Sequence, residues 1–181
     1  TIRRRDAFTK TALYIGITIP ILYFGIQLLA APFFPNYNFV DHIASLLGSD
    51  VSTFPTLFNM GAIIIGIVSI MASFGFLLAL QQLGVHWFLS WLTCAVLLSG
   101  ALGHVWAGLF PMPAPRHDAN PFAIGLFATP FLLPVVLWRL PNSKVIKIYF
   151  LVNILLFGIL VLFKSGVMNL GLLNHEGIFQ R

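Results

Sequence analysis

Charged residues are scarce in this sequence. Only 8% of its 181 residues are Asp, Glu, Lys or Arg, whereas about 25% is usual in soluble domains. Hydrophobic residues make up 59% of the chain, and they lie in long runs rather than in low-complexity repeats. This composition excludes a soluble globular domain, a disordered chain and a collagen-like chain. The sequence therefore predicts an integral membrane protein.

Cysteine and the common catalytic and metal-binding motifs are also few or absent. The single cysteine, Cys94, lies in an apolar run, so these residues offer neither an internal disulfide nor a thiolate metal cluster. No His-x-x-x-His, His-Glu-x-x-His or Gly-x-Ser-x-Gly pattern occurs. The ten Lys and Arg residues are too scattered for a nucleic-acid-binding surface. We expect no cofactor, no metal and no nucleic-acid partner, although His117-Asp118 and His175-Glu176 remain alternative metal ligands.

Five apolar stretches are long enough to cross a hydrocarbon core of about 30 Å. They cover residues 11–32, 56–80, 87–110, 121–138 and 145–163. The first is not typical of a signal peptide, because bulky Phe33-Phe34-Pro35 follows it where a cleavage site needs small residues. We expect an all-α, polytopic transmembrane helical bundle that forms one domain over residues 1–181, with a sixth helix beyond Arg181.

Basic residues in the short loops predict the orientation of the chain. If the N-terminus is cytoplasmic, seven Lys and Arg residues lie on the cytoplasmic side and three on the other. The excess of positive charge is normally cytoplasmic. We therefore expect a multi-pass protein of the plasma (inner) membrane with a cytoplasmic N-terminus, and with residues 33–55, 111–120 and 165–181 outside.

One histidine lies within a predicted span. At about 100° per residue, Gly100, Gly103, His104, Ala107 and Gly108 fall on one side of the third predicted helix. A face of small residues lets a neighbouring helix approach closely, so His104 should face the bundle interior. An ionisable residue within the membrane is a candidate for a functional role. The alternative is a neutral histidine bonded to a backbone carbonyl of another helix.

Polar residues gather on the predicted outer side. Four of the five acidic residues and three of the five histidines fall there. Asn59, at the same depth in the second predicted helix, is the expected hydrogen-bond partner of His104. The alternative is that these residues belong to solvated loops that never converge. We predict an outward-facing site made of Asp41, Ser45, Asn59, His104 and His117, closed by the C-terminal segment with Glu176 and Arg181.

Several of these residues suggest chemistry. Ser45 follows Asp41 by four residues within 40–47, predicted as one or two turns of interfacial helix, and this spacing puts both on one face. With His104 they offer an acid, a hydroxyl and a base, so whether the protein is an enzyme stays open. Arg116 and Arg181 are available to bind a phosphate or a carboxylate.

Prolines mark two further features. Pro111, Pro113 and Pro115 should end the third predicted helix and stiffen the loop that follows it. Pro130 and Pro134 should kink the fourth, which can open a cavity beside it.

Short motifs and their order along the spans resemble a known family. They are Ser45-Leu46-Leu47-Gly48, Asn59-Met60-Gly61, Phe110-Pro111 and Gly177-Ile178-Phe179-Gln180-Arg181. Over nearly the whole chain the sequence resembles the bacterial and archaeal membrane proteins grouped as domain of unknown function 998. The resemblance implies a six-helix membrane protein without an established activity.

These observations leave three classes of function. The first is binding of a lipid or amphipathic ligand in an outward-facing pocket, with membrane lipids as partners, or an accessory role beside other membrane subunits. The second is an outer-leaflet lipid hydrolase or transferase that uses Asp, Ser and His. The third is a small transporter, which is disfavoured because the chain shows no clear inverted repeat.

Overall fold

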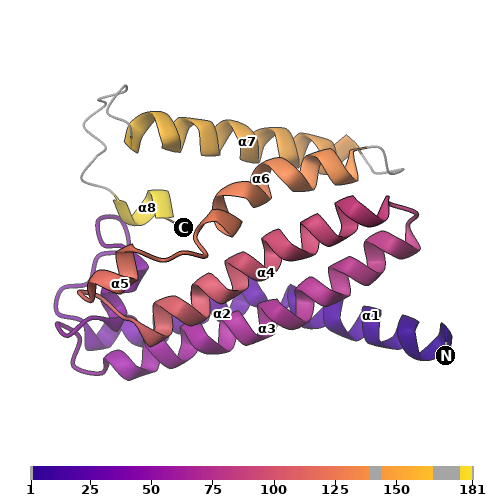
Figure 1. Ribbon diagram of the computed structural model, residues 1–181. Helices are drawn as coiled ribbons and strands as arrows, with labels where there is room; N and C mark the ends of the chain where they lie inside the picture. The colour runs from indigo at the N-terminus through magenta and orange to yellow at the C-terminus, as the bar shows by residue number, and fades with distance from the viewer. Residues whose placement is uncertain (1, 139–143, 165–175, 181) are drawn as a thin grey trace.

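The computed structural model describes residues 2–138, 144–164 and 176–180 (Figure 1). Helices make up 79% of the structure, and the described residues contain no β-strand, which confirms the all-helical prediction. The longer helices are α1 (Ile2–Ile17), α2 (Ile19–Ala30), α3 (Pro55–Gln82), α4 (Trp87–Leu109), α6 (Ile124–Leu137) and α7 (Lys144–Lys164). The short ones are η1 (Ala31–Phe33), η2 (Ala44–Gly48), α5 (Pro115–Asp118) and α8 (Glu176–Gln180).

Three segments of the described chain are long and apolar enough to cross a membrane, namely Arg4–Phe33, Pro55–Gln82 and Trp87–Leu109. The first begins earlier than predicted, because α1 continues back through the basic residues, which are good helix formers. Helix α6 is a shorter apolar helix of 14 residues, or about 21 Å at 1.5 Å per residue. It stays helical through both of its prolines. The predicted sixth helix lies outside the described residues.

Glycines set the distances between neighbouring helices. A Cβ on Gly66 of α3 would lie 2.8 Å from the carbonyl oxygen of Ala101 on α4, and one on Gly75 would lie 2.7 Å from the Cβ of Ala12 on α1. A Cβ on Gly125 of α6 would overlap the backbone nitrogen of Gly100 on α4. Such close approach is typical of helices that pack through small residues in membranes.

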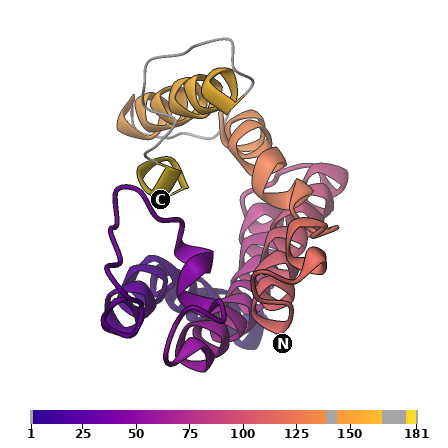
Figure 2. The same cartoon turned by 90° about the vertical axis from the view of Figure 1, so that its left-hand side faces the viewer.

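The long helices form an open arc when they are viewed along their axes (Figure 2). The order around the arc is α1 with α2, then α3, α4, α6 and α7. Phe157 of α7 packs between the rings of Phe127 and Phe131 of α6, with centroids 5.9 and 5.5 Å apart. At the loop end of the arc, the backbone N–H of Ile178 in α8 donates to the carbonyl of Val40 at 3.1 Å.

The segment between α2 and α3 folds back onto the end of the bundle. The backbone N–H of Thr53 donates to the carbonyl of Phe33 at 2.8 Å, which holds the two ends of the segment together. Its helical turns are η2, over Ala44–Gly48, rather than the predicted helix over 40–47. Asp41 precedes η2 in a turn in which the side-chain amide of Asn38 donates to its carboxylate. Asp41 and Ser45 therefore do not share a helix face, and that prediction was wrong.

Candidate functional site

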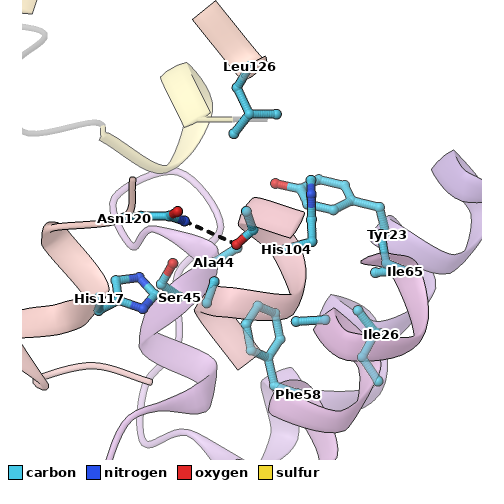
Figure 3. A pocket seen from close by; sticks show the side chains of 13 residues that line it. Tyr23, Ile26, Ala44, Ser45, Phe58, Ile65, His104, His117, Asn120 and Leu126 are labelled. Carbon is cyan, nitrogen blue, oxygen red and sulfur yellow. Dashed lines mark hydrogen bonds between the residues drawn. The ribbon is translucent and has the colours of Figure 1, made fainter. Parts of the chain in front are cut away.

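A cavity of about 430 Å³ lies where the loops meet the helices, and we call it the loop-end cavity (Figure 3). Its walls come from α2, α3, α4, η2 and the segment around α5 and α6. The residues that line it are Tyr23, Ile26, Ala44, Ser45, Phe58, Ala62, Ile65, Gly103, His104, Ala107, His117, Asn120 and Leu126. The cavity thus brings together residues that are far apart in sequence.

A second cavity of about 370 Å³, which we call the deep cavity, lies further along the same helices. It shares His104 and Leu126 with the loop-end cavity, and most of its other lining residues are apolar or small. On α3 the lining runs from Phe58 in the loop-end cavity to Phe76 in the deep cavity, a separation of 18 residues, or about 27 Å at 1.5 Å per residue. Together the two cavities extend over most of a hydrocarbon core of about 30 Å.

His104 lines both cavities. Its Nδ1 lies 3.0 Å from the carbonyl oxygen of Gly100, one turn earlier in α4. Because a carbonyl oxygen only accepts, Nδ1 carries the hydrogen in the neutral ring, and Nε2 is left as an acceptor. The ring also meets Tyr23 edge to face, with centroids 6.4 Å apart. The small residues that share this face of α4 with His104 contact two different helices: Gly108 packs on α3, whereas Gly100 approaches α6.

His117 lines the loop-end cavity from α5. Its Nδ1 lies 2.9 Å from the carbonyl oxygen of Phe110, so the same reasoning leaves its Nε2 as an acceptor. In Figure 3 the hydroxyl of Ser45 and the imidazole of His117 point toward one another. Ser45 comes from η2, so the two loop segments each contribute a polar side chain to the lining of the cavity.

The segment between α4 and α6 runs back along α4. Three side-chain hydrogen bonds hold it there: Trp106 Nε1 to the carbonyl of Arg116 at 2.7 Å, Asn120 Nδ2 to the carbonyl of Gly103 at 3.0 Å, and Ser99 Oγ to the carbonyl of Phe122 at 3.0 Å. The α4 residues in these pairs occur at successive turns, so the segment descends alongside the helix. Asn120 thereby lies beside Gly103 and lines the cavity (Figure 3).

The described residues that line either cavity include no Asp, Glu, Lys or Arg. The polar groups of the loop-end cavity are hydroxyl, amide and imidazole groups, which are uncharged when the histidines are neutral. Such a lining suits an uncharged polar group better than a full charge, because an unpaired charge in a mostly apolar site is costly. Among the residues that the structure describes, no group of three His, Cys, Asp or Glu side chains is placed to hold a metal ion.

The family model for proteins of unknown function DUF998 matches residues 17–180. The chain belongs to the DUF998 family. The match confirms the resemblance predicted from the sequence, and it includes every residue that lines the loop-end cavity. Comparisons with curated proteins and with solved structures give no match.

In this DUF998 protein three of the predicted site residues, Ser45, His104 and His117, line the loop-end cavity. Asn59 does not line it, and its predicted pairing with His104 was wrong. Asn59 Nδ2 instead donates to the carbonyl of Gly48 at 3.0 Å, while His104 bonds to its own helix. The His104 imidazole reaches the carbonyl four residues earlier in its own helix, and a shared depth with Asn59 does not by itself produce a pair.

The other predicted site residues lie away from the cavity lining. Arg116 is exposed, and its guanidinium lies 5.3 Å from the ring centroid of Phe110. Asp41 and Glu176 do not line either cavity, although α8, which begins at Glu176, is bonded to the loop that contains Asp41. Arg181 lies outside the described residues.

Sequence reasoning missed Tyr23, Asn120 and Leu126. Tyr23 lies in an apolar run whose residues are hydrophobic on all sides, so periodicity does not reveal its direction. Asn120 precedes Pro121, and its side-chain oxygen Oδ1 accepts from the backbone N–H of Phe122 at 3.0 Å, a local turn that Asn-Pro can signal. Leu126 has no signal in the sequence, because nothing distinguishes it from lipid-facing leucines.

Proposed function

We propose that this DUF998 protein binds a lipid or another amphipathic ligand in the loop-end and deep cavities. The observation that carries the proposal is the change from a partly polar lining in the loop-end cavity to a mostly apolar lining in the deep cavity. The loop-end cavity contains the polar groups of Ser45, His104, His117 and Asn120, whereas the deep cavity is mostly apolar. A ligand with a polar head and a hydrocarbon chain matches this arrangement, because its head would contact the polar groups of the loop-end cavity and its chain the apolar lining of the deep cavity.

We further propose that the loop end faces outward across a plasma membrane. The support is the distribution of basic residues, seven on the side of the N-terminus and three on the side of the loops. In this orientation the head group lies in the outer leaflet. Membrane lipids are then the partners of the protein.

Hydrolysis of a lipid receives less support. The proposed acid, Asp41, does not line the cavity and is bonded to Asn38. Nδ1 of His104 bonds to a backbone carbonyl instead of a carboxylate. A serine–histidine–acid triad needs an acid to orient the histidine, and the cavity lining includes none within the described chain.

Filling each cavity tests the proposal. A Cβ on Gly103, in the loop-end cavity, would have its nearest contact at 3.6 Å, and one on Gly100, in the deep cavity, at 3.5 Å. Both positions therefore accept a Cβ, and because both glycines line a cavity, we expect a leucine side chain there to occupy cavity volume. Gly25 is the matched control, because a Cβ there meets nothing within 4 Å and it lines neither cavity.

The measurement is the amount of lipid retained by protein purified in detergent, counted by native mass spectrometry. We expect Gly100→Leu and Gly103→Leu to retain several-fold less lipid than the wild type, and Gly25→Leu to retain as much. Equal retention by all four proteins would show that lipid is held on the outer surface of the bundle and not in the cavities.

A further inference from the structure

The two histidines determine which head group the cavity can accept. His104 Nδ1 and His117 Nδ1 each donate to a backbone carbonyl, at 3.0 and 2.9 Å. In the neutral rings both Nε2 atoms are therefore acceptors. The bond to Gly100 is the one hydrogen bond that the His104 ring makes within the described part of the chain. A ligand that satisfies these atoms in the neutral rings has to bring hydrogen-bond donors.

The described residues of the lining carry no charged side chain, and this narrows the choice of donor. An ammonium group also donates, but the described lining holds no carboxylate to balance it. A phosphate ester at neutral pH presents mainly acceptor oxygens, which would meet the Nε2 lone pairs. Arg116, the described cation nearest in sequence to His117, stacks on Phe110 outside the lining. A hydroxyl group is uncharged and donates one hydrogen while its oxygen accepts, which suits imidazole acceptors beside the Ser45 hydroxyl (Figure 3).

The deep cavity determines the rest of the ligand. Its lining on α3 runs from Ser69 to Phe76, or about 10 Å at 1.5 Å per residue. His104 and Leu126 line both this cavity and the loop-end cavity. A group bonded to the His104 ring is thus close to the apolar lining of the deep cavity, where a hydrocarbon chain attached to that group can be accommodated.

We infer that the ligand is an uncharged lipid alcohol, such as a diacylglycerol, whose hydroxyl donates to Nε2 of His104 while a hydrocarbon chain occupies the deep cavity. This inference rests on the proposed function and specifies its ligand. It also reverses an expectation from the sequence, in which Arg116 and Arg181 bind a phosphate or a carboxylate.

Three lipids with the same chains test the inference: dioleoylglycerol, its methyl ether and dioleoylphosphatidic acid. The ether lacks the donor, and phosphatidic acid replaces the hydroxyl with a phosphate. Retention is measured with radiolabelled lipid on the full chain in detergent micelles at neutral pH. We expect wild-type protein to retain dioleoylglycerol about fivefold more than either analogue, the factor of one ordinary hydrogen bond.

The variants assign that preference to one atom. His104→Phe should retain dioleoylglycerol and its methyl ether equally, because the acceptor is lost while an aromatic ring remains. His104→Gln should restore part of the preference, since its amide oxygen accepts. His86→Phe is the control, because His86 caps the other end of α4, accepting from the backbone N–H of Phe88 at 3.3 Å.

The outcomes separate this inference from the proposed function. If wild-type protein retains phosphatidic acid or the methyl ether as well as dioleoylglycerol, the inference is overturned but binding of an amphipathic ligand stands. If it retains none of the three lipids and no co-purified lipid, both fail. If His104→Phe keeps the full preference, the hydroxyl is bound elsewhere and the assignment to His104 is wrong. The comparison of the three lipids on wild-type protein holds even where a variant does not fold.

Discussion

Replacing Gly125 by alanine should destabilise the bundle, although alanine is the better helix former. A Cβ at this position would lie 2.5 Å from the carbonyl oxygen of Val96 and 2.8 Å from the Cβ of Ser99, and it would overlap the backbone nitrogen of Gly100. Two of these atoms belong to the backbone of α4, so no side-chain rotation relieves the contact. Helices α4 and α6 have to move apart.

The expected magnitude follows from two opposing effects. Overpacking in a tight site typically costs about 1–3 kcal/mol, and contact with rigid backbone places Gly125→Ala near the upper end. Alanine gains at most about 1 kcal/mol over glycine from helix propensity. The net loss of unfolding free energy is therefore about 2 kcal/mol.

The control is Gly158→Ala on α7, where a Cβ meets nothing within 4 Å, so only the gain in helix propensity remains. Unfolding is followed by circular dichroism while sodium dodecyl sulfate is added to protein in mild detergent micelles. We expect Gly125→Ala to unfold at a lower fraction of dodecyl sulfate than the wild type, and Gly158→Ala at an equal or higher one. If Gly125→Ala is as stable as the wild type, α4 and α6 do not cross at this glycine.

Three further predictions concern the loops and the boundary between the cavities. In a cysteine-free background, Asp50→Cys should react with a membrane-impermeant thiol reagent on intact cells and Leu83→Cys only after lysis; the reverse pattern would invert the proposed orientation. Asn59→Ala should lower the unfolding free energy by about 1–2 kcal/mol, because it leaves the carbonyl of Gly48 without its 3.0 Å partner; an unchanged dodecyl sulfate midpoint would contradict this. Leu126→Trp should reduce retention of long-chain lipids more than of short-chain analogues in the radiolabelled-lipid assay, because Leu126 lines both cavities. Equal loss of both lipids would argue against a chain passing this residue.

Hydropathy alone places the central helices accurately. The stretches predicted over 56–80 and 87–110 are the helices Pro55–Gln82 and Trp87–Leu109 in the structure. The stretch predicted over 121–138 shortens to Ile124–Leu137, because Asn120 forms a turn with Phe122 that apolar residues do not reveal. Long apolar helices can thus be predicted from the composition of the sequence, whereas the residues at which they begin and end depend on side-chain hydrogen bonds.

The candidate site is predictable only in part, because its members meet through the tertiary fold. Small residues around His104 indicate that it faces other helices, and Ser45 and His117 follow from their place in the loops near it. The partner of His104 was mispredicted because its ring bonds to the carbonyl of Gly100 in its own helix, while the amide of Asn59 bonds to the carbonyl of Gly48. Asp41 was misplaced because Asn38 organises a local turn around it.

The segment between α4 and α6, which runs back along α4, would also affect the electric field across a membrane that surrounds the bundle. Asn120 is bonded to Gly103, six residues before the end of α4 at Leu109, or about 9 Å below that end at 1.5 Å per residue. Non-helical backbone at such a depth is tolerated only where protein covers it or water reaches it, and here it borders the loop-end cavity. With the end of α4 at the edge of the hydrocarbon core, water entering that cavity would thin the low-dielectric layer by about 9 Å of roughly 30 Å. The membrane voltage would then fall over a shorter distance, with its steepest part beginning near His104.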